Sequence, residues 1–297
     1  MKEIRLRARA KINLTLDVTG KREDGYHELR TIMQTVNLQD GIYMKKIDKP
    51  VIRVKSNWEW LPTDERNLAY RGAQLMRDTF GIQEGVFIEL QKHIPVAAGL
   101  AGGSADCAAV LVGMNRLFGL RQSRETLMKM AAKLGSDIPY CILRGTALAE
   151  GIGDVITPVT HPFPPCFLVL VKPAFSVSTA YVYQHLRLDE IKVHPNTEEM
   201  LRAISRGDLH TIAHELCNVL ETVTIPKHPQ IGEIKDRMKA LGALGTLMSG
   251  SGPTVFGLFD KEEIALSAAG ILKQEFGIKD VFVTETFQNA QRGGETI

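Results

Sequence analysis

The 297-residue sequence lacks the features that mark several large classes of protein. Its four cysteines include no Cys-x-x-Cys pair, so neither a zinc site nor a disulfide framework is indicated, and the pattern is typical of a reducing cytosol. Residues 1–7 are rich in charge rather than apolar like a signal peptide, and no apolar run approaches a membrane span. The formal net charge is only +2. We therefore expect a cytoplasmic protein, monomeric or homodimeric, with neither nucleic acid nor a membrane as a partner.

The remaining composition is that of an ordinary globular protein, with 44% hydrophobic and 24% charged residues. The length is sufficient for two domains with their own cores. A proline-rich break at residues 161–165 predicts the boundary, which gives domains at residues 1–161 and 162–297. The second half has predicted strands and helices in the order β, α, β, β, α, β, which resembles a ferredoxin-like unit with extra helices inserted. The predicted fold class is α+β.

Hydrophobic periodicity predicts the individual elements. Strands are expected at residues 4–18, 29–36, 41–47, 51–55, 86–90, 146–150, 167–171, 245–248, 254–259 and 280–287. Helices are expected at residues 67–80, after Ser104, from Ser123 to Gly135, near residue 179, and at residues 198–219, 231–241 and 262–276. Residues 288–297 are expected to form a polar tail.

A run of small residues at 94–109 is the stretch around which the rest is organised. Pro95 biases the residue before it towards extended backbone, and Ser104, an N-cap residue type, precedes a helical pattern. Such a loop leaves N–H groups exposed at the positive end of a helix dipole, which favours phosphate. The spacing fits neither the Walker loop nor the Gly-x-Gly-x-x-Gly dinucleotide fingerprint. The alternative is a glycine-rich turn that only packs tightly against a neighbour.

Three stretches together resemble the motifs of the GHMP small-molecule kinases: residues 10–14, 95–109 and 247–256. The resemblance follows the family's order along the chain from Ala10 to about Phe287. It implies a two-domain GHMP kinase fold, with an N-terminal domain like that of ribosomal protein S5 and a ferredoxin-like C-terminal domain.

Residues 21–27, with the sequence Lys-Arg-Glu-Asp-Gly-Tyr-His, distinguish branches of this superfamily. They resemble the substrate loop of the branch that uses ATP to phosphorylate the 2-hydroxyl group of 4-diphosphocytidyl-2-C-methyl-D-erythritol, a cytidine-diphosphate-linked methylerythritol of the non-mevalonate isoprenoid pathway. One alternative is a homoserine or mevalonate kinase, which has no nucleobase to hold. Another is a non-catalytic nucleotide-binding or RNA-binding module. The presence of both Lys11 and Asp137, and the absence of a basic aromatic patch, argue against that module.

The resemblance also implies roles for individual residues. Asp137 would be the general base and Lys11 its partner, because a carboxylate can take the proton of an alcohol while a lysine offsets charge on the transferring oxygens. From the residues alone, Lys11 would be a solvated lysine on a strand and Asp137 an aspartate at a helix C-terminus. The implied ATP-binding residues are Pro95, Val96, Ala97, Ala98, Gly99, Leu100, Ala101, Gly102, Gly103, Ser104, Ala105, Asn67 and Leu68. The implied substrate-binding residues are Asn13, Tyr26, His27, Thr179 and Tyr183.

The phosphate loop departs from the superfamily pattern at one position. Many members have two serines where this chain has Ser104 followed by Ala105. Mg²⁺ is expected to accompany ATP, with Ser104 as the candidate protein ligand and with phosphate oxygens and water completing its coordination.

Overall fold

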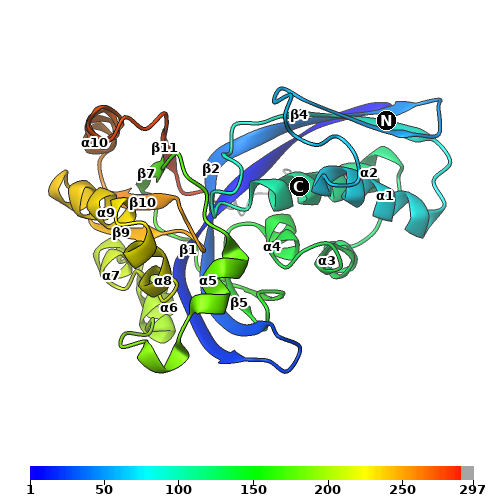
Figure 1. Cartoon of the computed structure of the whole chain (residues 1–297). Helices are drawn as coiled ribbons and strands as arrows, with labels where there is room; N and C mark the ends of the chain where they lie inside the picture. The colour runs from blue at the N-terminus through cyan, green and yellow to red at the C-terminus, as the bar shows by residue number, and fades with distance from the viewer. Residues whose placement is uncertain (289–297) are drawn as a thin grey trace.

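The computed structural model describes residues 1–288, which form two β-sheets with helices packed against them (Figure 1). The first sheet has seven strands and the second has four. Strands and helices are mixed in both halves of the chain, so the α+β prediction is confirmed. Residues 289–297, which include most of the predicted polar tail, lie outside the described residues. Among residues 1–288, no helix is both long and apolar enough to cross a membrane.

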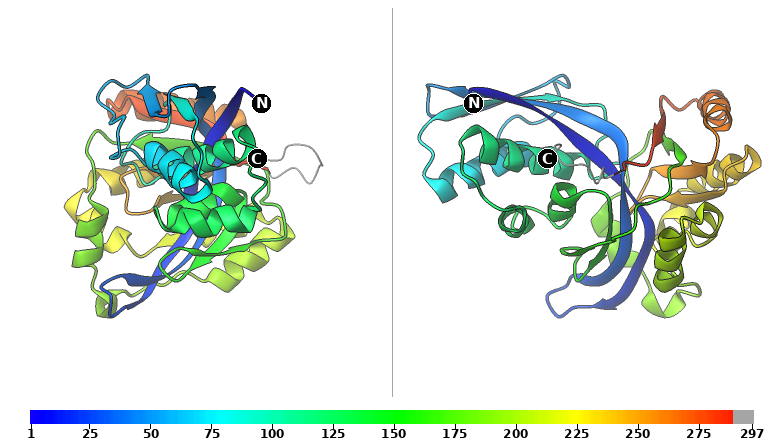
Figure 2. Two further views of the ribbon diagram at one scale, coloured as in Figure 1. Left: turned by 90° about the vertical axis from the view of Figure 1, so that its right-hand side faces the viewer. Right: turned by 180° about the vertical axis from the view of Figure 1, so that it is seen from behind.

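Two long strands, β1 (Glu3–Lys21) and β2 (His27–Ile47), form an antiparallel hairpin at the centre of the molecule (Figure 2). The first sheet has the order β3-β4-β2-β1-β8, and β5 joins β2 and carries β6. The remaining strands of this sheet are β3 (Ile52–Ser56), β4 (Gly85–Gln91), β5 (Thr146–Glu150), β6 (Val155–Pro158) and β8 (Cys217–Asn218).

The sequence predicts two strands where the structure has the single strand β2, so that prediction is wrong. Asn37, Gln39 and Asp40 interrupt the hydrophobic pattern and resemble a loop. The strand continues because its backbone pairs with β1 through this region, where Asp40 lies opposite Ala8. The Asp40 carboxylate is fully buried and accepts hydrogen bonds from three donors, which offset part of the cost of burying it.

Helices α1 (Leu68–Phe80), α2 (Gly102–Leu117) and α4 (Asp137–Leu143) pack against the first sheet, and α3 (Arg124–Ala132) packs against α2 and α4. Helix α2 is buried on nearly all sides, between the sheet and its helical neighbours. Asn67, predicted as the first residue of this helix, caps α1, and Gly81 ends it as predicted, with a φ of 64°. Ser123 caps α3 by accepting a hydrogen bond from the N–H group of Thr126.

Two predictions around these helices are wrong. Helix α2 begins at Gly102 rather than after Ser104, and the residue before it, Ala101, has a left-handed φ of 56°. No side chain caps α2, and the left-handed backbone of Ala101 marks the start of the helix. The structure also has helix α4, for which the sequence predicts no element, so Asp137 lies in the first turn of a helix instead of at a helix C-terminus.

The second sheet has the order β11-β7-β10-β9, with β7 (Phe167–Lys172), β9 (Gly245–Met248), β10 (Val255–Phe259) and β11 (Asp280–Glu285) all antiparallel to their neighbours. Helices α9 (Gln230–Ala240) and α10 (Glu262–Glu275) connect these strands in the predicted ferredoxin-like order. Val169 and Val171 of β7 pack into the core with α9 and α10. Leu168 and Leu170 lie on the opposite face of β7 and pack into the core that contains residues of β1 and β2. A strand buried on both faces explains the continuous apolar run of β7.

The segment between β7 and α9 differs from the predicted single helix at residues 198–219. It contains α5 (Thr179–His185), the short 3₁₀-helix η1 (Leu188–Glu190), α6 (Thr197–Arg206), α7 (Leu209–His214), β8 and α8 (Glu221–Lys227). Gly207, with a φ of 65°, ends α6 and produces the break. No helix or strand spans residues 159–166, but β8 pairs with β1 of the first sheet. The domain boundary between residues 161 and 162 stays a prediction.

Candidate active site

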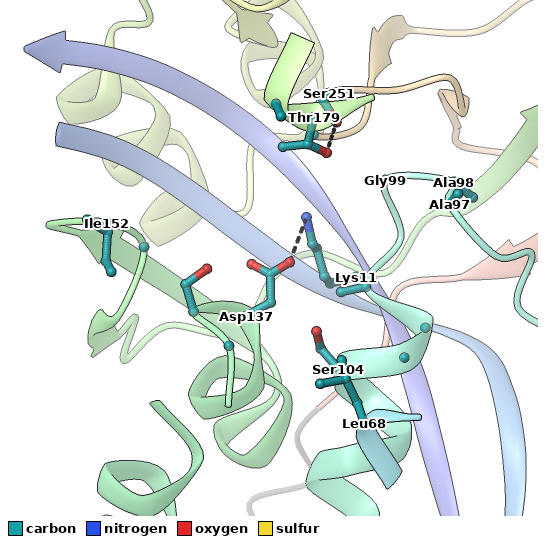
Figure 3. Close-up of a pocket in the computed structure, with 18 of the residues that line it drawn as sticks. Lys11, Leu68, Ala97, Ala98, Gly99, Ser104, Asp137, Ile152, Thr179 and Ser251 are labelled. Carbon is teal, nitrogen blue, oxygen red and sulfur yellow. Dashed lines mark hydrogen bonds and ion pairs between the residues drawn. The ribbon is translucent and has the colours of Figure 1, made fainter. Parts of the chain in front are cut away.

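A cavity of about 1140 Å³ lies between the two halves of the chain, lined by β1, the loop before α2, the start of α4, helix α5 and the loop after β9 (Figure 3). Single small-molecule sites are usually about 300–1,000 Å³. The cavity therefore has room for more than one compact ligand, and its lining places residues from distant parts of the sequence next to one another.

The loop at residues 95–101 has the geometry of an anion-binding turn. Ala97, Gly99 and Ala101 have φ values of 52°, 75° and 56°, so left-handed residues alternate with others along the loop. Such alternation turns successive N–H groups towards one side and forms a concave site for an anion. Left-handed alanines are strained and are concentrated at functional sites. The loop therefore has a backbone geometry that packing against a neighbour does not by itself require.

The loop after β9 supports this turn from the other half of the chain. Ser249 Oγ donates a hydrogen bond to the Gly99 carbonyl oxygen at 2.9 Å. A Cβ atom at Gly99 would lie 2.2 Å from the Ser249 carbonyl oxygen, so only glycine permits this approach. Asn218 in turn donates to the carbonyl oxygens of Met248 and Gly250, each at 2.8 Å. The second and third motifs of the sequence thus form one continuous wall of the cavity.

Lys11 and Asp137 lie together in this cavity, as Figure 3 shows. The Lys11 ammonium nitrogen is 4.0 Å from the Asp137 carboxylate and donates to Asn13 Oδ1 at 2.7 Å. The Lys11 side chain is only 6% exposed, so it is not a solvated surface lysine, whereas that of Asp137 is 39% exposed. Asn13 donates onward to Thr31 Oγ1 at 2.8 Å. This chain of hydrogen bonds fixes the lysine and leaves the carboxylate open to the cavity.

Aromatic side chains also line the cavity. The rings of His27 and Tyr183 are 5.2 Å apart between centroids and tilted by 32°, although the residues come from β2 and α5. Tyr26 is 61% exposed and lines the cavity. Burial lowers the pKa of His27 and raises the pKa of Tyr183, so both rings are held in their neutral forms. Thr179 shares a hydrogen bond of 2.8 Å with Ser251 beside them.

Most of the residues predicted for the site line the cavity, including Asn67 and Leu68. The side chains of Leu100 and Ala105 do not: both are buried in the hydrophobic cores. The cavity is also lined by residues for which the sequence predicts no role, among them Leu61, Pro62, Arg66, Lys92, Asp106, Gln184 and Ser251. Of these seven, Asp106 and Ser251 lie within the second and third motifs, and the other five carry no signal in the sequence.

The oxygen donors of the cavity fit a magnesium ion that is held mainly by phosphate and water. The Ser104 hydroxyl and the Asp137 carboxylate both line the cavity, on the two sides that Figure 3 shows. Among residues 1–288, no three His, Cys, Asp or Glu side chains are grouped to hold a metal ion. Mg²⁺ commonly binds through one or two protein oxygens while keeping its waters and contacting substrate phosphates.

Comparison with known proteins identifies the family. Models of the GHMP kinases N terminal domain and the GHMP kinases C terminal domain match residues 67–145 and 200–278. The 4-diphosphocytidyl-2-C-methyl-D-erythritol kinase of Lachnoclostridium phytofermentans is 52% identical over 286 residues, covering 96% of this chain and 98% of that protein. The kinase of the same name from Caldicellulosiruptor saccharolyticus is 50% identical, covering 96% and 97%. The chain belongs to the 4-diphosphocytidyl-2-C-methyl-D-erythritol kinase family.

Solved structures agree with this family. A crystal structure of 4-(cytidine 5'-diphospho)-2C-methyl-D-erythritol kinase has a TM-score of 0.82 and 33% identity, covering 95% of this chain and 99% of the other. The homoserine kinase of Cytophaga hutchinsonii has a TM-score of 0.78 at 22% identity, covering 97% and 95% of the two chains, and shows the shared fold alone. The GHMP kinase fold predicted from the three motifs is confirmed. The resemblance of residues 21–27 predicted the correct branch of the superfamily.

Proposed function

We propose that this chain transfers the γ-phosphoryl group of ATP to the 2-hydroxyl group of 4-diphosphocytidyl-2-C-methyl-D-erythritol. The observation that carries this is that a single cavity is lined by the anion-binding turn, by Lys11 and Asp137, and by the His27–Tyr183 ring pair. A homoserine or mevalonate kinase has no base for that ring pair to hold. The names of the relatives support the same substrate.

Asp137 is the proposed general base. Its carboxylate is exposed to the cavity and can accept the proton of the substrate hydroxyl as the new bond to phosphorus forms. The proton ends on Asp137, and the bridging oxygen leaves with ADP. Because phosphoryl transfer passes through a loose transition state, the base has little covalent work, and positioning dominates.

Lys11 is proposed to stabilise negative charge at the reacting centre. Its ammonium group is almost completely buried and is aimed at the cavity by Asn13, so it does not need to reorganise during the reaction. A fixed positive charge in a water-poor site is worth far more than one in bulk water. The same charge stabilises the Asp137 carboxylate.

The anion-binding turn and the first N–H groups of α2 are proposed to hold the phosphates of ATP, and Asn67 and Leu68 to contact its adenine end. A bound magnesium ion would neutralise part of the negative charge of these phosphates. Ser104 is the proposed protein ligand for it.

Tyr26, His27 and Tyr183 are proposed to hold the cytosine ring, with Thr179 and Asn13 lining the path towards Lys11. A flat exposed ring such as Tyr26 can stack on a base, whereas an imidazole can hydrogen-bond to its edge. A cytoplasmic location is also proposed, in agreement with four cysteines that are all free thiols. A monomer or a homodimer remains the proposed assembly.

The test is ADP release from ATP and Mg²⁺ with a panel of alcohols. We expect release with the cytidine-diphosphate-linked methylerythritol and none above background with homoserine, mevalonate or methylerythritol alone. Phosphorus NMR of the product should show a new monophosphate ester at the 2-position. Equal rates with homoserine or mevalonate, or ADP release that is independent of any alcohol, would contradict the proposal.

A further inference from the structure

Three charged side chains form a buried cluster beneath the phosphate loop, apart from the proposed reacting groups. Lys92 follows β4, Asp40 lies on β2, and Asp106 lies in the second turn of α2. Lys92 Nζ donates to Asp106 Oδ2 at 2.7 Å and also to Asp40 Oδ2. None of these side chains is more than 4% exposed. Burying three charged groups is costly, so the fold retains them against a considerable penalty.

The cluster connects the two ends of the phosphate loop. Asp40 Oδ1 accepts hydrogen bonds from the N–H groups of His93 at 2.6 Å and Ile94 at 2.9 Å, immediately before the loop begins. Asp106 lies one helical turn after Gly102, where the loop ends and α2 begins. The Lys92 ammonium group therefore links the backbone that enters the loop to the helix that leaves it. Both ends are fixed relative to strand β2.

The cluster also lies in direct proximity to the loop itself. A Cβ atom at Gly102 would lie 3.6 Å from Lys92 Nζ, which is ordinary van der Waals contact. It would lie only 2.9 Å from Ile94 Cγ2, so glycine lets the start of α2 approach Ile94 this closely. Lys92 and Asp106 both line the cavity that the loop lines. A shift of either side chain would therefore move the first turn of α2, where Gly102, Gly103 and Ser104 line the cavity.

Lys92 places one ammonium group between two buried carboxyl groups. Burial raises the pKa of Asp106 well above its usual range, the charge of Lys92 lowers it, and the charge of Asp40 raises it. Asp40 accepts hydrogen bonds from three donors, which offset part of the cost of burying it. Asp106 Oδ1 is buried and has no hydrogen-bond partner within residues 1–288, so the contact of its Oδ2 with Lys92 is what holds this carboxyl group.

We propose that Lys92, Asp40 and Asp106 are positioning residues that set the geometry of the phosphate loop for nucleotide binding. This rests on the proposed function only in that the loop binds nucleotide phosphates. The competing explanation is that the cluster stabilises the fold without influencing the loop. The two explanations predict different ADP affinities. If the cluster positions the loop, a variant of it binds ADP more weakly than a control variant that loses the same amount of stability elsewhere in the fold.

The decisive variants change Asp106 alone. Asp106→Ala removes the connection to α2, whereas Asp106→Asn keeps an oxygen that can accept a hydrogen bond from Lys92. We expect Asp106→Ala to weaken ADP binding, measured by calorimetry, by about tenfold, within the range by which residues that do not touch a ligand modulate its binding. The KM for the cytidine substrate should stay unchanged, and Asp106→Asn should restore most of the ADP affinity. Asp106→Leu, which keeps more volume, is the second variant if the alanine variant does not fold.

Thr146→Val is the matched control, because it removes a different buried hydrogen bond of the same domain, from Thr146 Oγ1 to Gln34 Oε1 at 2.6 Å. We expect it to lower the Tm without changing ADP affinity. If Asp106→Ala (or Asp106→Leu) lowers the Tm as Thr146→Val does and binds ADP as the unchanged protein does, the proposal is overturned. An Asp106→Asn variant as weak as Asp106→Ala would also overturn it. Failure of the unchanged protein to bind ADP would instead contradict the proposed function.

Discussion

The Lys11 ammonium nitrogen lies 4.0 Å from the Asp137 carboxylate but only 2.7 Å from Asn13 Oδ1. The first distance is longer than a hydrogen bond, and the second is a normal one. Lys11 is therefore fixed by the hairpin of the first sheet, while Asp137 is presented separately by the first turn of α4. Two groups held independently leave an approach between them for a hydroxyl oxygen, which a tight ion pair would close.

Asp137→Asn tests the general base. The amide keeps the shape of the side chain but cannot take the proton, so kcat should fall by about 10²–10⁴-fold, the usual size of a general-base contribution. The measurement is steady-state kinetics at saturating ATP and cytidine substrate. ADP affinity, which does not depend on proton transfer, serves as the control and should stay within about twofold. A fall in kcat of less than about fivefold would remove Asp137 from the mechanism.

The sequence predicts the elements that bury one face, because a single buried face gives a regular hydrophobic pattern along the helix or strand. Asn67 and Gly81 bound helix α1 through local caps, and both are readable from residue type. Helix α4 was missed because its seven residues give too short a pattern and include Pro139, which is tolerated in a first turn. The predicted start of α2 is three residues late, because the helix follows Ala101, and residue type does not reveal that this alanine has a left-handed φ of 56°.

The candidate site also has a part that the sequence predicts and a part that only the structure shows. Lys11, Asp137 and the phosphate loop were found through motifs, and their grouping in one cavity is visible only in the structure. The buried cluster of Lys92 was missed entirely, because Asp40 and Asp106 lie 52 and 14 residues away from it in the sequence. A charged residue inside a strand or helix pattern normally indicates an exposed face. Only the three-dimensional pairing shows that these charges compensate one another.

Gly99→Ala tests the contact between the phosphate loop and the loop after β9. A Cβ atom there would lie 2.2 Å from the Ser249 carbonyl oxygen, in addition to the strain of an alanine at a φ of 75°. We expect ADP affinity to fall about tenfold or more, because the anion-binding turn must move. The free energy of unfolding should fall by about 1–3 kcal/mol beyond the backbone strain, as for other overpacked sites.

Gly81→Ala is the control for that variant. Gly81 has a comparable φ of 64°, but nothing lies within 4 Å of the position that a Cβ atom would take there, so only the backbone strain of about 1–2 kcal/mol is added. Its ADP affinity should match that of the unchanged protein. If Gly99→Ala and Gly81→Ala lose equal stability and bind ADP equally well, the contact with Ser249 does not shape the phosphate loop.

His27 gives a pH dependence with a defined sign. Burial first, and then the positive charge of Lys21, lower the pKa of His27 below 6.5. The stability associated with the neutral ring is therefore present above pH 6.5 and is lost as the pH falls through the lowered pKa. A protonated ring also loses its acceptor nitrogen, so kcat/KM for the cytidine substrate should fall in the same range. His27→Gln, which keeps an acceptor oxygen, should show a flatter profile; an identical fall in that variant would assign the titration to another group.

The last prediction separates stacking from hydrogen bonding at the cytosine end of the cavity. Tyr26 is 61% exposed and free to lie over a base, whereas His27 is held at 5.2 Å from the Tyr183 ring. Stacking tolerates any base and is worth about 1–3 kcal/mol per base, so Tyr26→Ala should weaken the cytidine substrate and its uridine analogue by similar factors.

Hydrogen bonding does not tolerate the exchange of bases. Uridine presents an acceptor where cytidine presents its amino donor, which leaves groups of the site unpaired. His27→Ala should therefore mainly reduce the preference for the cytidine substrate over its uridine analogue. The measurement is kcat/KM for both substrates in the Tyr26→Ala and His27→Ala variants, at fixed ATP and magnesium. Because His27→Ala also removes a neighbour of the Tyr183 ring, some loss common to both substrates is expected. If that common loss is the whole effect and the cytidine preference survives, the histidine supports the Tyr183 ring and does not contact the edge of the base.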